Sequence, residues 1–109
     1  MTEDVDTVPP ETVRERIAAG DDFDLVDIRD TDAYVDDHLP GADHLTIEEL
    51  EDVVVERDWN DKVVVYCYVG ETSVQAARFV AEYGDAETVA SMEGGYEAWV
   101  DDDSLGGAD

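Results

Sequence analysis

The residue with the clearest chemical potential is Cys67, the only cysteine among 109 residues. It follows the apolar run 63–66 and opens a short loop that ends where the helical pattern of residues 73–80 begins. A thiol between the carboxyl end of a buried strand and a helix amino terminus lies near backbone N–H groups without helical partners. Such surroundings stabilise the thiolate, which is the nucleophilic form. We therefore expect Cys67 to serve chemistry rather than packing.

The loop after Cys67 is suited to holding negative charge on sulfur. Backbone N–H groups from residues 68–73 could surround the sulfur and stabilise an anion without a charged side chain. Glycine at position 70 suits a tight turn that brings these groups close, and two hydroxyl groups follow it. The candidate substrate-binding residues of the loop are Tyr68, Val69, Gly70, Glu71, Thr72 and Ser73.

Strand-like and helix-like segments alternate along the chain, which is typical of an α/β protein with a parallel sheet. Thr46 and Glu49 form a capping-box pattern before one helix, and Asp30 or Thr31 can cap a short one. We expect strands over residues 5–8, 23–28, 44–45, 63–66 and 88–90, and helices over 11–19, 30–36, 47–54, 73–83 and 96–100.

The charge balance is extreme, with 31 Asp and Glu against 6 Lys and Arg, a formal net charge of −25. Such self-repulsion destabilises a compact chain in dilute buffer, whereas molar salt shortens the Debye length to about 3 Å. The composition therefore favours a cytosolic protein of a high-salt cell, such as a halophilic archaeon, over a disordered acidic chain. Partners with phosphate backbones or anionic membrane surfaces are not expected, because the sequence contains no basic patch.

Other site types lack their signatures in the sequence. One Cys and two His show no recognisable metal-ligand spacing, and we expect neither a metal nor a cofactor. A single Cys forms no internal disulfide, in keeping with a reducing cytosol. No apolar run approaches the ~20 residues that a membrane helix needs, and the acidic amino terminus does not have the pattern of a secretory signal.

Three separated segments together resemble the single-domain rhodaneses, the thiosulfate-type sulfurtransferases. The first reads LVDIR at residues 25–29, followed by Tyr34 and by HLPGA at 38–42. The second reads VYC at 65–67, with Gly70 and Ser73 after it, and the third reads MEGGYEAW at 92–99. Their order and spacing extend the resemblance over residues 5–100.

The resemblance implies a rhodanese domain over residues 1–100, before an acidic, Gly-rich tail over 101–109. It implies a central, mostly parallel sheet of about five strands, with helices on both faces and the active loop at the carboxyl ends of the strands. It also implies that Cys67 takes a sulfane sulfur from thiosulfate or a persulfide and passes it to a thiol or a sulfur carrier. A monomer or weak dimer is expected.

Loop length separates sulfur chemistry from phosphate chemistry. The six residues 67–72 match the shorter loop that the family uses for sulfur, whereas related cell-cycle phosphatases carry a longer one. Cys-based phosphatases also need an Arg six residues after the Cys, which grips the phosphoryl oxygens in a bidentate manner. Ser73 stands at that position, so phosphatase activity is not expected.

Two loop residues depart from the common rhodanese pattern. Tyr68 follows the Cys where the family often has Arg or Lys, and Glu71 adds a negative charge. At roughly 8 Å and an effective dielectric constant of roughly 20, Glu71 would oppose the thiolate by about 2 kcal/mol. The alternative is that Glu71 is a solvated surface carboxylate. We hypothesise from these departures that the physiological donor is a protein persulfide or another sulfur source rather than thiosulfate.

Charged residues outside the loop have two readings each. In rhodaneses the pair formed by Asp27 and Arg29 mainly holds loops together, and the functional alternative is that Arg29 attracts an anionic donor. The residue at the position of His38 usually orders the turn before Pro-Gly-Ala. The alternative for His38 is a nucleophile–base pair with Cys67.

Two other functions compete with sulfur transfer. A non-catalytic rhodanese-like module would use the same cleft to dock a protein, and a redox-sensing thiol would form sulfenic acid without turning over sulfur. Cys67, Gly70 and the six-residue loop favour the enzyme.

Overall fold

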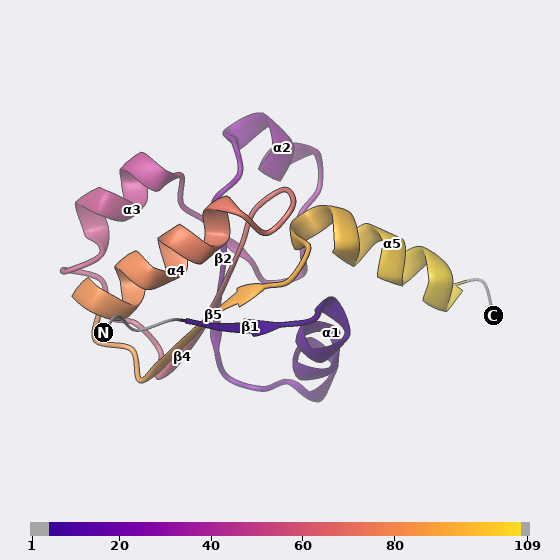
Figure 1. Cartoon of the computed structure of the whole chain (residues 1–109), viewed down its shortest axis with the longest axis horizontal. Helices are drawn as coiled ribbons and strands as arrows, with labels where there is room; N and C mark the ends of the chain where they lie inside the picture. Colours follow the sequence, from indigo (N-terminus) through magenta and orange to yellow (C-terminus); the bar gives the residue numbers. More distant parts are fainter. Residues whose placement is uncertain (1–4, 108–109) are drawn as a thin grey trace.

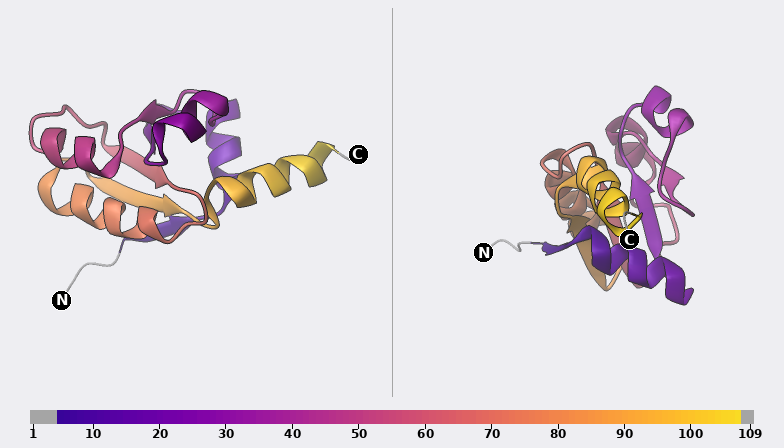
Figure 2. Two further views of the ribbon diagram at one scale, coloured as in Figure 1. Left: turned by 90° about the horizontal axis from the view of Figure 1, so that it is seen from above. Right: turned by 90° about the vertical axis from the view of Figure 1, so that its right-hand side faces the viewer.

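The computed structural model describes residues 5–107, in which five parallel strands form one sheet in the order β1-β5-β4-β2-β3. Helices cover both faces (Figures 1 and 2), and the predicted fold class is confirmed. The strands are β1 (Asp6–Val8), β2 (Asp24–Asp27), β3 (Asp43–His44), β4 (Lys62–Tyr66) and β5 (Thr88–Met92). The helices are α1 (Pro10–Ala19), α2 (Thr31–Asp36), α3 (Ile47–Val53), α4 (Thr72–Tyr83) and α5 (Gly95–Gly107).

Strand β4 shows why the sheet needs helices on both sides. Its side chains alternate between two faces, so that Val63 and Val65 join one apolar cluster while Val64 and Tyr66 join the other. Helices α3 and α4 pack on the first face, and α1, α2 and α5 contribute to the second. All four strand residues are buried, as is usual for a central strand of a parallel sheet.

Local signals set several helix ends as the sequence predicts. The backbone N–H of Glu49 donates to Thr46 Oγ1 at 3.3 Å, and Thr46 N–H donates to Glu49 Oε1 at 3.0 Å, which completes the capping box of α3. Helix α1 ends at Gly20, whose φ of +73° lies in the left-handed region that glycine adopts without strain.

Three local predictions need correction. Strand β5 continues to Met92 instead of ending at residue 90, because it pairs along β1 as well as β4. Helix α5 begins at Gly95 and reaches Gly107 rather than stopping at residue 100, since residues 101–105 contain neither Gly nor Pro. Part of the predicted tail is therefore helical, and α5 extends away from the sheet (Figure 2). Asp30 occupies the N-cap position of α2 but makes no side-chain cap hydrogen bond.

The topology places the end of β4 at the middle of the sheet, between β5 and β2. The loop that connects β4 to α4 leaves from this point and lies beside the start of α5 (Figure 1). None of the helices within residues 5–107 has the length and apolar composition needed to cross a membrane.

Candidate active site

Cys67 directly follows β4 and belongs to the apolar cluster that α4 covers, together with Ala76 and Ala77. The residue is only 4% exposed, so the thiol is recessed below the loop. Burial of this kind does not separate a reactive thiol from a packing residue, and the distinction depends on the polar groups around the sulfur.

Polar groups converge on the sulfur of Cys67. The backbone N–H groups of Gly70 and Ser73 donate to Sγ at 3.2 and 3.3 Å, and Sγ lies 3.4 Å from Ser73 Oγ. Burial raises the pKa of the thiol, but hydrogen bonds from the side chain and backbone of Ser73 and from the backbone of Gly70 and Val69 outweigh it, so that the pKa is lowered. Of the amides expected around the sulfur, those of Gly70 and Ser73 donate to it, and they favour the thiolate.

Glycines hold the loop close to the start of α5. Gly70 has a φ of +89°, and a Cβ at this position would lie 2.8 Å from Gly94 N. Gly95 also lies close to the loop, since a Cβ at this position would lie 2.5 Å from the carbonyl oxygen of Cys67. The same carbonyl accepts a hydrogen bond from Tyr96 N–H at 2.8 Å. The Gly-Gly segment therefore contacts the loop after Cys67 directly, beyond forming the tight turn that its composition indicates.

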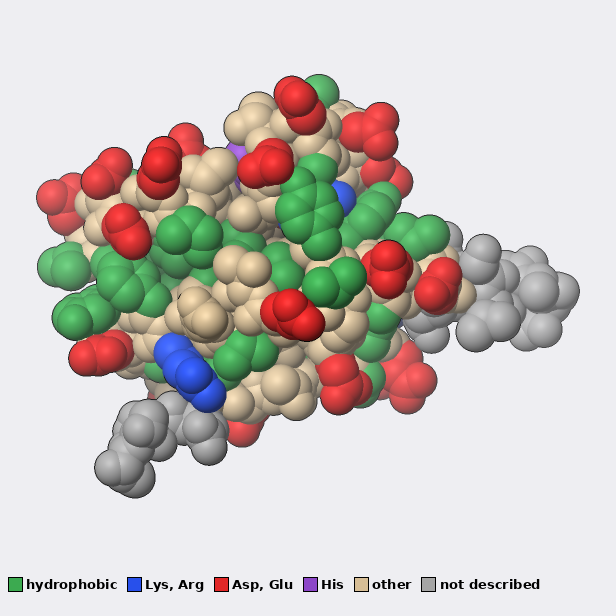
Figure 3. Space-filling view, turned by 45° about the horizontal axis from the view of Figure 1, so that its top comes forward, with side chains coloured by type: hydrophobic (Ala, Val, Ile, Leu, Met, Phe, Trp, Pro, Cys, Tyr) green, Lys and Arg blue, Asp and Glu red, His purple; other side chains and the backbone are tan. Residues whose placement is uncertain are grey.

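The remaining loop side chains form a rim around the sulfur rather than touching it. Tyr68 and Val69 are 47% and 46% exposed, and Glu71 and Thr72 are exposed as well. The hydroxyl of Tyr68 donates to Asp30 Oδ2 at 3.1 Å, and this carboxylate makes no cap hydrogen bond to α2. On this side of the molecule apolar side chains gather among Asp and Glu, and Lys and Arg are sparse (Figure 3).

Exposure of Glu71 bears on its electrostatic effect. The side chain makes no capping hydrogen bond at the start of α4 and is open to solvent. Solvent and salt screen an exposed charge strongly. The structure therefore favours the solvated surface carboxylate, and its repulsion of the thiolate is smaller than the sequence-based figure of about 2 kcal/mol, which assumes an effective dielectric constant of roughly 20.

Arg29 is turned into the protein, where it is 4% exposed. Its Nε lies 3.1 Å from both carboxylate oxygens of Asp27, and Nη2 lies 2.8 Å from Oδ2. Nη2 also donates to the carbonyl oxygen of Asp37 at 2.6 Å. Burial lowers the pKa of the guanidinium, but its hydrogen bond and charge interaction with Asp27 outweigh this, so that the pKa is raised. This pairing favours the loop-holding role of Arg29 over donor binding.

Two tyrosines complete the network around Arg29. The hydroxyl of Tyr66 donates to Asp27 Oδ2 at 2.6 Å and accepts from Leu39 N–H at 3.1 Å. The Tyr96 ring lies 4.0 Å from the guanidinium carbon, and its hydroxyl donates to Asp37 Oδ2 at 2.7 Å. Burial and this hydrogen bond raise the pKa of Tyr96 to about 12. The network ties the end of β2 to the residue that precedes Cys67.

Both histidines stack on one tyrosine. The ring of His38 lies 3.9 Å from that of Tyr34, and the ring of His44 lies 4.7 Å away. His38 Nδ1 is 2.8 Å from the carbonyl oxygen of Tyr34, and His44 Nε2 is 2.7 Å from that of Arg29. These contacts assign His38 to ordering the turn, and they do not pair it with Cys67.

Ser91 is a contact of the site that the sequence-based reasoning missed. Its Oγ lies 2.7 Å from Ser73 Oγ, and both residues are buried. Residue 91 lies beyond the predicted end of its strand, so the strand pattern gave it no partner. The available signal was a lone polar residue in an apolar run just before the Gly-Gly segment.

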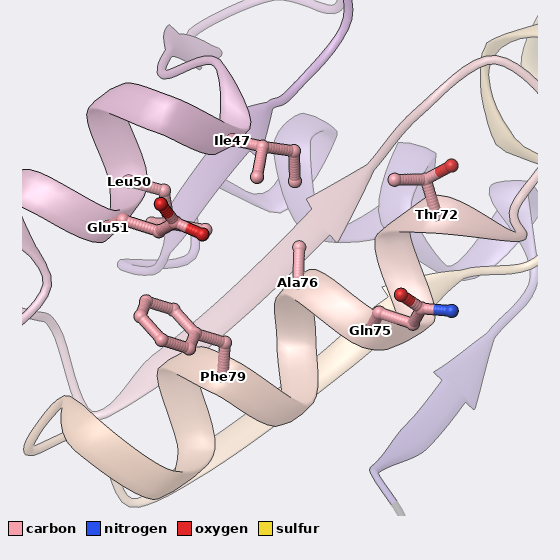
Figure 4. Close-up of a pocket in the computed structure, with 7 residues that line it drawn as sticks. All are labelled: Ile47, Leu50, Glu51, Thr72, Gln75, Ala76 and Phe79. Carbon is pink, nitrogen blue, oxygen red and sulfur yellow. The ribbon is translucent and has the colours of Figure 1, made fainter.

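A pocket of about 260 Å³ opens between α3 and α4, next to the loop (Figure 4). Its apolar floor includes Leu50 and Ala76, which share a core cluster with Cys67. Thr72 and Gln75, on the first turn of α4, form its edge nearest the loop. In the described part of the chain, no group of three or more His, Cys, Asp or Glu side chains is arranged to hold a metal ion.

Comparison with known proteins identifies a matching family and structures that share the fold. The model of the family described as Rhodanese-like domain matches residues 9–102. A protein of unknown function from Rhodopseudomonas palustris, titled a possible tyrosine phosphatase, is 28% identical, with a TM-score of 0.77 over 91% of this chain and 82% of that one.

Two further structures share the fold at lower identity. A rhodanese-related protein from Thermoplasma volcanium is 23% identical, with a TM-score of 0.73 over 89% of this chain and 92% of that one. The human single-domain sulfurtransferase TSTD1 is 22% identical, with a TM-score of 0.75 over 87% of this chain and 95% of that one.

Proposed function

Because the chain belongs to the rhodanese-like domain family, we propose that it is a sulfurtransferase that carries sulfane sulfur on Cys67. The observation that supports this most is the convergence of the Gly70 and Ser73 N–H groups on Sγ. An anionic thiolate, and then an anionic persulfide, would need this arrangement of donors. A cysteine that serves only as a small hydrophobe would not need it.

The proposed reaction has two displacements. First, the Cys67 thiolate attacks the outer sulfur of the donor, a new S–S bond forms, and the donor's S–S bond breaks with its electron pair on the leaving group. Second, a nucleophilic acceptor attacks the outer sulfur of the persulfide, and the thiolate of Cys67 leaves. Main-chain amides of the loop stabilise the sulfur anion at both stages. The mechanism needs no metal or organic cofactor.

Phosphate chemistry fits the site less well, although one relative is titled a possible tyrosine phosphatase. Ser73 occupies the position at which a phosphatase needs Arg, and its side chain faces the sulfur from a fully buried position. Arg29 does not replace the missing cation, because it is bonded to Asp27. The loop therefore offers amides and one hydroxyl, and no bidentate grip for a phosphoryl group.

For the donor, we propose a protein persulfide or another thiol-derived persulfide rather than thiosulfate. The loop of residues 67–72 contains no Lys or Arg, and Glu71 lies on its exposed rim. A thiosulfate dianion would meet the rim without a cation from the loop to bind its sulfonate. A persulfide on a thiol needs no such cation. The acceptor is a thiol or a sulfur-carrier protein.

The proposed setting is a cytosol with molar salt, on the basis of the net charge of −25. Cations at this concentration screen the repulsion among surface carboxylates. The Tm should therefore rise with KCl up to molar concentrations. A Tm that stays constant or falls as KCl is raised would contradict this setting.

Intact mass spectrometry at high KCl tests the sulfur-transfer proposal. After incubation with a low-molecular-weight persulfide, the wild-type protein should gain one sulfur atom, and dithiothreitol should remove it. Thiosulfate at the same concentration should load the protein more slowly. The Cys67→Ser variant should gain none. Cyanide or a thiol added to the loaded protein should release the sulfur in stoichiometric amount.

A binding module is the second candidate, and one observation favours it. Tyr68 and Val69 expose apolar surface next to a recessed thiol, which suits the docking of a protein. If no sulfane donor gives an adduct on Cys67, the binding module replaces the enzyme. Sulfenic acid on Cys67 without sulfur turnover would favour a redox-sensing thiol.

A further inference from the structure

Two buried serine hydroxyl groups form a chain of contacts that begins at the sulfur of Cys67. Ser73 Oγ lies 3.4 Å from Cys67 Sγ, and Ser91 Oγ lies 2.7 Å from Ser73 Oγ. Ser73 and Ser91 are 0% and 1% exposed. Their hydroxyl groups are thus withdrawn from bulk water, and the bonds within the row decide where each proton points.

The hydrogen bond between Cys67 and Ser73 reverses its direction if it persists when the thiol ionises. In the neutral state the thiol of Cys67 donates to Ser73 Oγ. A thiolate has no proton and can only accept, so this bond is kept only when Ser73 turns its single proton toward the sulfur. A hydroxyl group has one proton and two lone pairs. Ser73 can therefore donate to the sulfur only if the contact with Ser91 is one in which Ser73 accepts.

We propose that Ser91 is a positioning residue for the Cys67 thiolate, because it donates to Ser73 Oγ and so directs the Ser73 proton at the sulfur. Ser91 does not touch the reacting atom; it acts through Ser73. The inference rests on the proposed function only in that the thiolate is taken to be the nucleophile.

The position of Ser91 on the sheet supports this role. It lies on β5 and pairs with Val65 of β4, two residues before Cys67. Strand β5 is held between β1 and β4, so the serine is on a rigid element rather than on the loop. Ser73 lies in the first turn of α4. The hydrogen bond therefore joins the helix that donates to the sulfur to the strand beside it.

Alkylation of Cys67 measures the thiolate directly, because the protein contains no other cysteine. The rate of reaction with iodoacetamide is recorded against pH at molar KCl. Ser91→Ala removes the donor to Ser73 Oγ, which makes the Ser73 hydroxyl group a weaker and less well oriented donor to the sulfur, and we expect the midpoint of the profile to move up by about half to one pH unit. At pH values below the midpoint, the variant should load sulfur more slowly than the wild-type protein. At pH values above it, the two rates should become equal.

Two controls separate this role from packing. Thr88→Ala removes a hydroxyl group from the same strand at its other end, where Thr88 Oγ1 donates to Asp61 O at 3.4 Å, and the midpoint should not move. In a Ser73→Ala background, Ser91→Ala should cause no further shift, because its effect passes through the Ser73 hydroxyl group. A second shift of equal size would overturn the proposal.

Ser91→Thr and Ser91→Val form a second pair in case the alanine variant does not fold. The two new side chains have nearly the same shape, and only threonine retains a hydroxyl group. The threonine variant should keep the wild-type midpoint, and the valine variant should show the upward shift. Equal midpoints in both would contradict the proposal.

The other ionisable groups on the elements beside the thiol are unchanged in all of these variants. Those nearest in sequence to Cys67, Ser73 and Gly95 are Tyr66, Tyr68, Glu71, Arg78, Glu93, Tyr96 and Glu97. If the wild-type protein takes up no sulfur but Ser91→Ala still shifts the midpoint, the proposed function fails and the positioning role stands. If the wild-type protein takes up sulfur but Ser91→Ala has the wild-type midpoint, the proposed function stands and the positioning role of Ser91 fails.

Discussion

Strands β2 and β4 are neighbours, and each ends in a polar group that must be stabilised without water. At the end of β2 the carboxylate of Asp27 meets the guanidinium of Arg29, and both are buried. At the end of β4 the polar groups recorded at the sulfur of Cys67, within residues 5–107, are amide N–H groups and one serine hydroxyl group, and no countercharge. One site neutralises a charge with a countercharge, and the other stabilises an anion with dipoles.

The difference indicates which of the two sites is free to react. The hydrogen bonds of Arg29 go to Asp27 and to carbonyl oxygens around α2, so this pair closes on itself and fixes the loops beside it. The amides around Cys67 favour the thiolate but do not neutralise its charge. The sulfur can therefore remain nucleophilic. Tyr66 joins the two regions, since its hydroxyl bonds to Asp27 and the next residue is Cys67.

The largest effect should come from breaking the closed pair. Asp27→Asn leaves the buried guanidinium of Arg29 without a countercharge, which should lower the free energy of unfolding by about 3–5 kcal/mol. Asp43→Asn is the matched control, because Asp43 is 56% exposed and its bond to Arg57 at 2.8 Å is a surface pair. That control should cost less than about 1 kcal/mol. Urea unfolding at molar KCl measures both, and equal losses would show that the Asp27–Arg29 pair is not a structural anchor.

The second largest effect should come from a change at Gly70, in the loop whose amides surround Cys67. Gly70→Ala adds a Cβ that lies 2.8 Å from Gly94 N, at a φ of +89°. The loop must shift, and its N–H should move away from the sulfur. We expect a loss of about 1–3 kcal/mol in stability and at least a tenfold slower sulfur loading.

Gly20→Ala separates backbone strain from damage to the loop. Gly20 has a φ of +73°, with nothing within 4 Å of the added Cβ, and it lies at the end of α1. This variant should lose stability and keep its loading rate per folded molecule. Equal loading rates in Gly70→Ala and Gly20→Ala would show that the position of the loop does not determine the rate of sulfur loading.

Loss of the Tyr66 hydroxyl group, which connects the two strand ends, should lower stability by an intermediate amount. Tyr66→Phe removes the donor to Asp27 and the acceptor for Leu39 N–H, which should cost about 1–2 kcal/mol of unfolding free energy. Tyr68→Phe removes a hydroxyl group that bonds an exposed Asp30, and its cost should be close to zero. Thermal unfolding of Tyr66→Phe and Tyr68→Phe measures this difference in stability. Equal stabilities would show that the Tyr66 hydroxyl group does not support the Asp27–Arg29 pair.

The smallest effect should come from the rim. Glu71→Gln removes an exposed charge, so kcat/KM for thiosulfate and cyanide should rise by no more than about fivefold, the equivalent of a surface charge pair. The rise should be smaller in molar KCl because of screening. Glu82→Gln, an exposed change farther along α4, is the control. An unchanged kcat/KM for Glu71→Gln would remove Glu71 as a reason to disfavour thiosulfate.

The parts of the site that are contiguous in sequence were predictable, and the parts that depend on tertiary pairing were not. The step from strand to Cys67 to helix lies within a few residues, so strand and helix signals place the amides. Ser91 follows Ser73 by 18 residues, and its contact depends on where β5 ends. The end of β5 was wrong because pairing with neighbouring strands, and not local composition alone, determines how far a strand continues. Helix α5 was predicted too short although residues 101–105 contain neither Gly nor Pro.

The nucleophilic role proposed for Cys67 requires that main-chain amides hold it as a thiolate. The most direct test compares the pH profile of Cys67 alkylation in the native protein with that in the urea-unfolded protein. Because the hydrogen bonds lower the pKa of the thiol, reactivity should rise at lower pH in the native state than in the unfolded chain. A native midpoint at or above the unfolded one would show that burial outweighs the amides, and it would contradict the account.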